Sequence, residues 1–338
     1  MSRTLVVAPS WVGDAVLTHP MLVRLKEREP DTPIDVLAPG WALAVFRRMP
    51  EVAQTLAFPF GHGELRLGER RRFARALVPY ARAIVLPNSL KSALVPWHAG
   101  VAVHTGYRGE MRYGLLNDVR TLDEKALPLI VERFAALAQP AGEALGRPLP
   151  EPRLRVDEAS RAAALTKFGL DPRRPIAAFA PGAEYGPAKQ WPARHFAELG
   201  AMLIDRGLQI WLLGSANDAG ITRDIAASLG GEGRKAVFDL AGRTSLDEAI
   251  DLLSLAARVV TNDSGLMHVA AALDRPMAAL FGSSSPAFTP PLSARARVIT
   301  LALSCSPCFQ RVCPLGHTNC LVQLEASGVL SHLEPFEP

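Results

Sequence analysis

Residues 259–281 read VVTNDSGLMHVAAALDRPMAALF, and this stretch decides the fold class. Its apolar, β-branched start predicts a strand at 259–261, and the apolar run 277–281 predicts a second strand. Between them, the polar loop 262–265 leads into a helical pattern at 266–273. A strand, a helix and a strand in this order form the repeating unit of a parallel α/β sheet.

The same alternation of strands and helices precedes this stretch. Toward its N-terminal side it predicts strands at 176–180 and 209–213, and helices at 192–206 and 246–256. Ser245 and Glu248 form a capping-box pattern at the start of the last of these helices. A second series occupies the first half of the chain, with strands at 5–8, 34–37 and 83–86, a turn at 9–13 and a helix at 14–28.

A linker is predicted between the two series. Residues 139–152 read QPAGEALGRPLPEP, in which four prolines and two glycines disfavour regular structure. The sequence therefore predicts two Rossmann-like, doubly wound parallel-sheet domains, at residues 1–155 and 156–338. In such sheets ligands bind at the carboxyl ends of the strands, so we expect the functional loops of both domains to face a shared cleft.

Composition excludes several classes of protein. With 338 residues, of which 49% are hydrophobic and 21% charged, the chain has enough apolar material for two cores and is not expected to be disordered. The longest uncharged stretch, residues 276–294, contains four prolines and does not resemble a membrane span. The apolar run at 5–8 is too short for a secretory signal, which predicts a cytoplasmic location.

Charge is unevenly distributed along the chain. The formal net charge is +4, with about +5 in residues 1–150 and −1 in residues 151–338. This asymmetry indicates an anionic partner for the first half, such as nucleic acid, a phosphorylated lipid or a membrane surface. The densest basic run, Arg70 to Arg72, is either part of such a surface or a solvated helix face.

Two loops of the second series carry residues suited to chemistry on a phosphorylated ligand. Ser264 and Gly265 precede a helix whose N-terminus attracts anions, although Asp263 or Ser264 can equally be an ordinary N-cap. His268, in the first turns of that helix, either faces the bound anion or is structural. Lys189, in the loop 182–192, is either a solvated lysine or a cation that neutralises a leaving diphosphate.

Asp14 follows the first predicted strand, and its carboxylate is placed either to cap the next helix or to accept a proton from an attacking hydroxyl. Other chemistries lack their motifs, because the sequence contains no P-loop and no G-x-S-x-G elbow. The one G-x-G-x-x-A match, residues 231–236, precedes a predicted strand and so lacks the context of a dinucleotide site.

All four cysteines fall in one window: Cys305, Cys308, Cys313 and Cys320. The C-x2-C spacing at its start suits a metal chelate, and a cytoplasmic protein keeps its thiols reduced. The later spacings match no common zinc module. A structural zinc site, four free thiols and a disulfide therefore all remain open, and each gives the segment a local structural role.

Five motifs together resemble a known family. They are residues 10–14 (SWVGD), 87–94 (PNSLKSAL), 106–114 (GYRGEMRYG), 181–192 (PGAEYGPAKQWP) and 261–268 (TNDSGLMH). Over residues 3–300 the chain is similar to the ADP-heptose:lipopolysaccharide heptosyltransferases, in particular to the heptosyltransferase II group.

This resemblance implies a GT-B glycosyltransferase of lipopolysaccharide inner-core biosynthesis in a Gram-negative bacterium. Such an enzyme transfers L-glycero-D-manno-heptose from ADP-heptose, with inversion, to the first heptose of heptosyl-Kdo2-lipid A. Its N-terminal domain holds the acceptor and its C-terminal domain the donor. The resemblance further implies no required cofactor, a monomer, and peripheral attachment to the cytoplasmic face of the inner membrane.

Carried over residue by residue, the resemblance makes Asp14 the general base and Lys189 the group that stabilises the departing ADP. It implies donor contacts from Glu184, Asn217, Asp218, Gly242, Thr244, Asp263, Ser264, Gly265 and His268. It implies acceptor contacts from Asn88, Lys91, Arg108 and Arg112.

Three other functions remain as alternatives. A heptosyltransferase acting on a different inner-core acceptor would have the same donor site. A nucleotide-sugar 2-epimerase would turn over the donor without any acceptor. A nucleic-acid-binding protein is disfavoured, because the basic run lacks interleaved aromatic residues and matches no recognised module.

Overall fold

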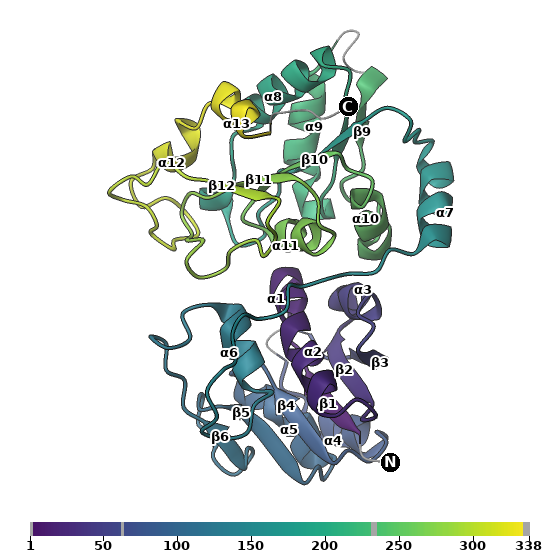
Figure 1. The fold of residues 1–338 in the computed structure, drawn as a ribbon, viewed down its shortest axis with the longest axis vertical. Helices are drawn as coiled ribbons and strands as arrows, with labels where there is room; N and C mark the ends of the chain where they lie inside the picture. Colours follow the sequence, from purple (N-terminus) through teal and green to yellow (C-terminus); the bar gives the residue numbers. More distant parts are fainter. Residues whose placement is uncertain (1–2, 62–63, 231–234, 334–338) are drawn as a thin grey trace. The chain divides into compact units, whose positions relative to one another are not determined.

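The structure, a computed structural model, describes residues 3–61, 64–230 and 235–333 (Figure 1). The chain divides into two compact units, Met1–Pro152 and Arg153–Pro338. The predicted domains met at residues 155 and 156, three residues further along the chain. Most of the glycine motif at 231–236 lies outside the described residues.

The N-terminal unit is built on a six-stranded parallel sheet. Its order is β3-β2-β1-β4-β5-β6, so the chain changes direction across the sheet between β1 and β4. The strands are β1 (Thr4–Val7), β2 (Ile34–Pro39), β3 (Val52–Phe58), β4 (Arg82–Val85), β5 (Val103–Tyr107) and β6 (Asp118–Arg120). The central strand β1 is fully buried, as its β-branched sequence predicts.

Helices of this unit pack in two groups. One contains α1 (Val12–Leu17), α2 (His19–Arg28), α3 (Leu43–Arg47) and α6 (Ile130–Ala136), and the other contains α4 (Leu67–Arg75) and α5 (Leu90–His98). The single helix predicted at 14–28 is wrong in this respect, because the structure has two helices that meet at Thr18. Pro20 accounts for the break, since it fits the first turn of α2 but cannot continue α1.

The C-terminal unit repeats the plan with the order β12-β11-β10-β7-β8-β9, again all parallel. The strands are β7 (Ile176–Ala180), β8 (Gln209–Leu212), β9 (Val237–Asp239), β10 (Arg258–Asn262), β11 (Met277–Leu280) and β12 (Ala296–Ile299). The chain changes direction between β7 and β10. Ligands of doubly wound sheets bind at such a point.

Its helices also form two groups: α8 (Ala193–Asp205), α9 (Ala219–Ser228) and α13 (Ala326–Leu333) in one, and α7 (Glu158–Phe168), α10 (Leu246–Leu253) and α11 (Gly265–Ala272) in the other. The capping box at Ser245 and Glu248 is confirmed. Helix α10 ends three residues earlier than predicted. The short helix α12 (Asn319–Val322) follows the cysteine-rich segment.

Arg70 corrects the interpretation of the basic run. Its side chain is fully buried, its guanidinium lies 4.4 Å from the ring centre of Phe60, and it donates hydrogen bonds to the carbonyls of Glu64 and Leu65. Burial lowers the pKa of Arg70. This arginine therefore anchors α4 in the protein interior and is not part of an anion-binding surface.

Among the described residues, no helix has the length and apolarity that a bilayer crossing requires.

Candidate active site

The predicted donor residues gather at one edge of the C-terminal sheet. They lie in the loops that follow four neighbouring strands, β10, β7, β8 and β9, and in the first turns of α11. Because the carboxyl ends of parallel strands meet at the same edge, residues far apart in sequence come together there.

Lys189 and Asp263 form an ion pair at the centre of this edge. The Lys189 Nζ lies 2.6 Å from Asp263 Oδ2, and the two side chains are 17% and 6% exposed. Lys189 comes from the loop after β7 and Asp263 from the loop after β10, the two strands between which the chain changes direction. The ammonium also lies 5.1 Å from the ring centre of Tyr185. The pair thus holds a cation in place with part of its surface still open to solvent.

Asn262 fastens these two loops together, and the sequence interpretation gave it no role. Its side-chain amide is buried, donates to the carbonyl of Pro181 at 2.6 Å and accepts from the backbone N–H of Trp191 at 3.1 Å. Both ends of the Lys189 loop are therefore tied to the end of β10. The residue stands inside the quoted motif TNDSGLMH, but its role depends on contacts across about 80 residues of chain.

The N-terminus of α11 begins directly after this ion pair. Its N-cap is Ser264 in an extended conformation, and no side chain caps the helix. Ser264 is therefore the N-cap by position, as one alternative held, but its side chain makes no capping hydrogen bond, and Asp263 is not the N-cap. The first backbone N–H groups of a helix have no partner within the helix and carry its positive dipole end. Together with Lys189, this helix terminus forms an anion-binding corner.

His268 lies one turn into α11 and is 5% exposed. Its Nδ1 is buried and has no hydrogen-bond partner. Burial lowers the pKa of His268 to about 4; the nearby Asp263 carboxylate opposes this shift and Lys189 adds to it. The imidazole is therefore neutral at physiological pH, with an unused polar atom beside the ion pair.

The neutral state of His268 predicts a pH-dependent stability. Below its ordinary pKa of 6.5 the unfolded chain binds a proton at this residue while the folded chain does not, so stability falls as the pH drops from 6.5 to 4. The expected loss is about 3 kcal/mol. Urea unfolding of His268→Gln should show a smaller loss than wild type over this window. The exposed His332→Gln serves as control, and parallel curves for wild type and His268→Gln would contradict the assignment.

A second set of donor residues surrounds the loop after β8. Asp218 accepts hydrogen bonds from the N–H and hydroxyl of Ser215, and Asn217 donates to Glu184 at 3.3 Å. A Cβ on Gly182 would lie 2.2 Å from the Asp218 carboxylate, so a larger residue there would force that carboxylate to move. The structure thus brings Glu184, Asn217 and Asp218 together.

Gly242 and Thr244 belong to the loop after β9, which packs on the same corner. Gly242 has a φ of +69°, and a Cβ there would lie 2.9 Å from the Cα of Ala216. The backbone of this loop therefore approaches the β8 loop more closely than any other residue would allow. Thr244 donates to the carbonyl of Leu240 at 3.3 Å.

In the N-terminal unit, Asp14 lies after β1 at the other change of direction. It is the third residue of α1, whose N-cap is Trp11, so the alternative in which Asp14 caps the helix is wrong. A carboxylate in the first turn is favoured by the helix dipole. The side chain is partly exposed at the carboxyl edge of the sheet.

The predicted acceptor residues of this unit differ in exposure. Asn88 and Arg108 are exposed in the loops after β4 and β5, and Lys91 is partly exposed at the start of α5. Arg112 is only 3% exposed, and its guanidinium donates to the carbonyls of Pro87 and Tyr107 and to Asn88 Oδ1. This side chain holds the two loops together instead of offering a free cation to a ligand.

All four cysteines are free thiols, so the disulfide alternative is wrong for this structure. Among the residues that the structure describes, no group of three or more His, Cys, Asp or Glu side chains has an arrangement ready to hold a metal ion.

Known proteins resemble the chain over its full length. It is 48% identical to lipopolysaccharide heptosyltransferase 2 of Escherichia coli K12 and 47% identical to that of Salmonella typhimurium LT2, in each case over 98% of this chain and 97% of the relative. The structure of E. coli ADP-heptose lps heptosyltransferase II superposes with a TM-score of 0.89 at 46% identity, covering 98% of this chain and 97% of the other.

A UDP-GlcNAc 2-epimerase from Methanocaldococcus jannaschii has a TM-score of 0.51 at 12% identity over 88% of this chain and 89% of the other, which is a likeness of fold alone. The predicted fold class, two Rossmann-like parallel α/β sheets, is confirmed by the E. coli structure. The model of glycosyltransferase family 9 (heptosyltransferase) matches residues 70–319. The chain therefore belongs to glycosyltransferase family 9, the heptosyltransferases, and is a glycosyltransferase.

Proposed function

We propose that this enzyme transfers a heptose from ADP-heptose to the first heptose of heptosyl-Kdo2-lipid A in lipopolysaccharide core biosynthesis. The observation that carries the proposal is the Lys189–Asp263 pair at the uncapped N-terminus of α11, in a chain 48% identical to a lipopolysaccharide heptosyltransferase 2. This corner offers a cation and backbone donors to a diphosphate and a carboxylate to sugar hydroxyls.

The reaction is a single displacement at the anomeric carbon. The acceptor hydroxyl oxygen bonds to that carbon while Asp14 accepts its proton, and the bond to the β-phosphate oxygen of ADP breaks. Negative charge then grows on the diphosphate, where Lys189 and the α11 amides stabilise it. Attack opposite the leaving group inverts the configuration.

Binding is divided between the two units. Glu184, Asn217, Asp218, Gly242 and Thr244 line the loops proposed to enclose the ribose and adenine. Asn88, Lys91 and Arg108 contact the anionic acceptor, with Arg112 positioning their loops. The excess of positive charge in residues 1–150 suits an acceptor that carries phosphates and carboxylates.

The proposal extends to location and cofactors. The enzyme works as a monomer in the cytoplasm, peripherally at the inner membrane where its lipid-linked acceptor lies. It needs no divalent ion for catalysis, because Lys189 and the helix terminus supply the positive charge. Transfer in EDTA should proceed at the rate found with added magnesium. A loss in EDTA that magnesium restores would contradict this mechanism.

Acceptor choice is tested by incubating the enzyme with ADP-heptose and lipopolysaccharide precursors that carry zero, one or two heptoses, followed by mass spectrometry. We expect one heptose to be added to the precursor that already has one. Addition to either of the other precursors would make the enzyme a heptosyltransferase of different acceptor specificity. Donor turnover without any acceptor would indicate an epimerase.

A further inference from the structure

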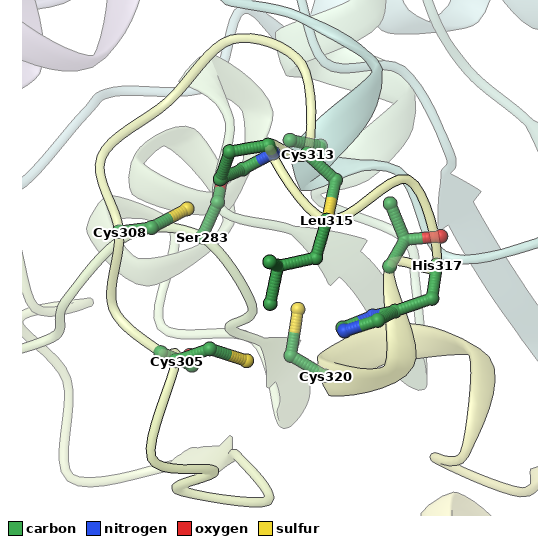
Figure 2. A pocket seen from close by; sticks show the side chains of 11 residues that line it. Ser283, Cys305, Cys308, Cys313, Leu315, His317 and Cys320 are labelled. Carbon is green, nitrogen blue, oxygen red and sulfur yellow. The ribbon is translucent and has the colours of Figure 1, made fainter.

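The segment between β12 and α12 folds around a small cavity that the transfer mechanism does not use. All four cysteines of the chain line it, together with Ser283 from the loop after β11 and His317 (Figure 2). Its volume is about 20 Å³. That volume accommodates one water-sized atom or ion and excludes a multi-atom cluster.

The thiols approach this cavity from different sides. Figure 2 shows Cys305 and Cys308 on one wall and Cys320, at the start of α12, on another, with their sulfur atoms directed inward. All four cysteine side chains line this one small cavity. In the described structure no three of these side chains are already arranged to hold a metal ion, so binding requires the thiols to rotate toward the cavity.

One buried polar group at this cavity lacks a partner. The Ser283 hydroxyl is 2% exposed and has no hydrogen-bond partner, although it lines this cavity. A buried hydroxyl without a partner is costly, and a metal-bound thiolate beside it would supply the missing acceptor.

His317 lines the cavity but is poorly suited to be a ligand. The backbone N–H of Asn319 donates to its Nδ1 at 3.0 Å. In the neutral imidazole, Nε2 then carries the proton and has no lone pair for a metal. Four sulfur ligands remain, which is the complete set for a tetrahedral ion.

We propose that Cys305, Cys308, Cys313 and Cys320 bind a single zinc ion as a tetrahedral, purely structural tetrathiolate site. On binding, four S–H bonds are lost, four Zn–S bonds form and the protons pass to solvent, with no change of oxidation state. Four soft sulfur ligands and a closed coordination shell are typical of structural zinc and leave no position for catalysis.

This site lies directly behind the loop that carries Lys189. Ala188 also lines the cavity, and its N–H donates to the carbonyl of Arg311 at 3.1 Å. The Tyr185 hydroxyl donates to the carbonyl of Phe309 at 2.9 Å. At Gly186 a Cβ would lie 2.5 Å from the Arg311 carbonyl oxygen. The zinc-bound segment thus supports the Lys189 loop, and the cysteines are positioning residues for donor binding, an effect that rests on the proposed function.

Metal content tests the site independently of activity. The full chain, purified under reducing conditions, should contain one zinc ion per chain when measured by inductively coupled plasma mass spectrometry. Cobalt substitution should give the visible absorption of a tetrahedral tetrathiolate. Cys313→Ser and Cys320→Ser should lose the ion, whereas the control His317→Ala should keep it.

Each other outcome overturns part of the proposal. Reduced protein without metal, or a disulfide in its place, would overturn the site. Stoichiometric iron would retain the four-thiolate centre but overturn zinc. Loss of the ion in His317→Ala would overturn the ligand set.

Calorimetry with ADP tests the link to Lys189. We expect Cys320→Ser to bind ADP several-fold more weakly than wild type, and His317→Ala to bind it normally. Unchanged ADP affinity in a metal-free Cys320→Ser would overturn the positioning role while the zinc site stands. Failure of heptose transfer by the wild-type enzyme would instead count against the proposed function.

Discussion

Replacing Asp14 by asparagine is expected to lower the turnover number by about 10²-fold to 10⁴-fold, the usual contribution of a general base. The amide has nearly the same shape as the carboxylate but cannot accept the proton of the acceptor hydroxyl. Because Asp14 lies in the N-terminal unit and the donor corner in the C-terminal unit, ADP affinity should not change. Steady-state assays combined with calorimetry separate the two effects.

Glu27→Gln is a matched control for this variant. Glu27 lies in the neighbouring helix α2 and forms an exposed ion pair with Arg24 at 2.9 Å. Its replacement removes one carboxylate from the same unit and should leave turnover unchanged. Near-normal turnover of Asp14→Asn would refute the assignment of the base, and weakened ADP binding would place Asp14 in the donor site instead.

Replacing Lys189 by methionine is expected to weaken ADP binding and to lower turnover by about 10²-fold to 10³-fold, the range measured when one preorganised electrostatic group is lost. The side chain keeps its length and its packing against Tyr185 but loses the charge that faces the leaving diphosphate. It also leaves the nearly buried Asp263 carboxylate without its partner, which should cost about 1–3 kcal/mol of stability.

The double variant Lys189→Met/Asp263→Asn separates these effects. Removing the orphaned charge should restore much of the stability but none of the ADP affinity. Lys167→Met is the control, because Lys167 forms a more exposed ion pair with Glu248 at 2.8 Å in the same unit. If ADP affinity were unchanged in Lys189→Met, the lysine would be only structural.

Most inner strands of each sheet could be predicted from sequence, and the strands at the edges could not. β1 and β7 are buried on both faces and therefore appear as continuous apolar runs. β3, β6 and β9 are partly exposed edge strands, and their mixed composition gives no such signal. The edge strand β12 was missed for the same reason, whereas the inner strand β5 was missed although four of its five residues are buried, because its sequence VHTGY is not a continuous apolar run.

Candidate site residues could be predicted where the local sequence marks them, and were missed where their role depends on distant contacts. Asp14, Lys189 and Asp263 were identified because each follows a predicted strand in a loop of unusual composition. The role of Asn262 depends on partners at Pro181 and Trp191, which only the folded sheet brings near.

For two arginines the sequence suggested a surface role that the structure does not support. The sequence suggests exposed cations at Arg70 and Arg112, but backbone carbonyls accept their hydrogen bonds in the interior. Every residue has a backbone carbonyl, so the sequence does not reveal which carbonyls will accept these hydrogen bonds. Charge runs therefore overestimate the basic surface of this unit.

A crystal structure with a non-transferable analogue of ADP-heptose would test the proposed roles of Lys189, α11 and Asp14 together. We expect the diphosphate to contact Lys189 and the first backbone N–H groups of α11, and the Asp14 carboxylate to face the anomeric carbon on the side opposite ADP. A diphosphate bound away from α11, or a carboxylate turned away from the anomeric carbon, would contradict these roles.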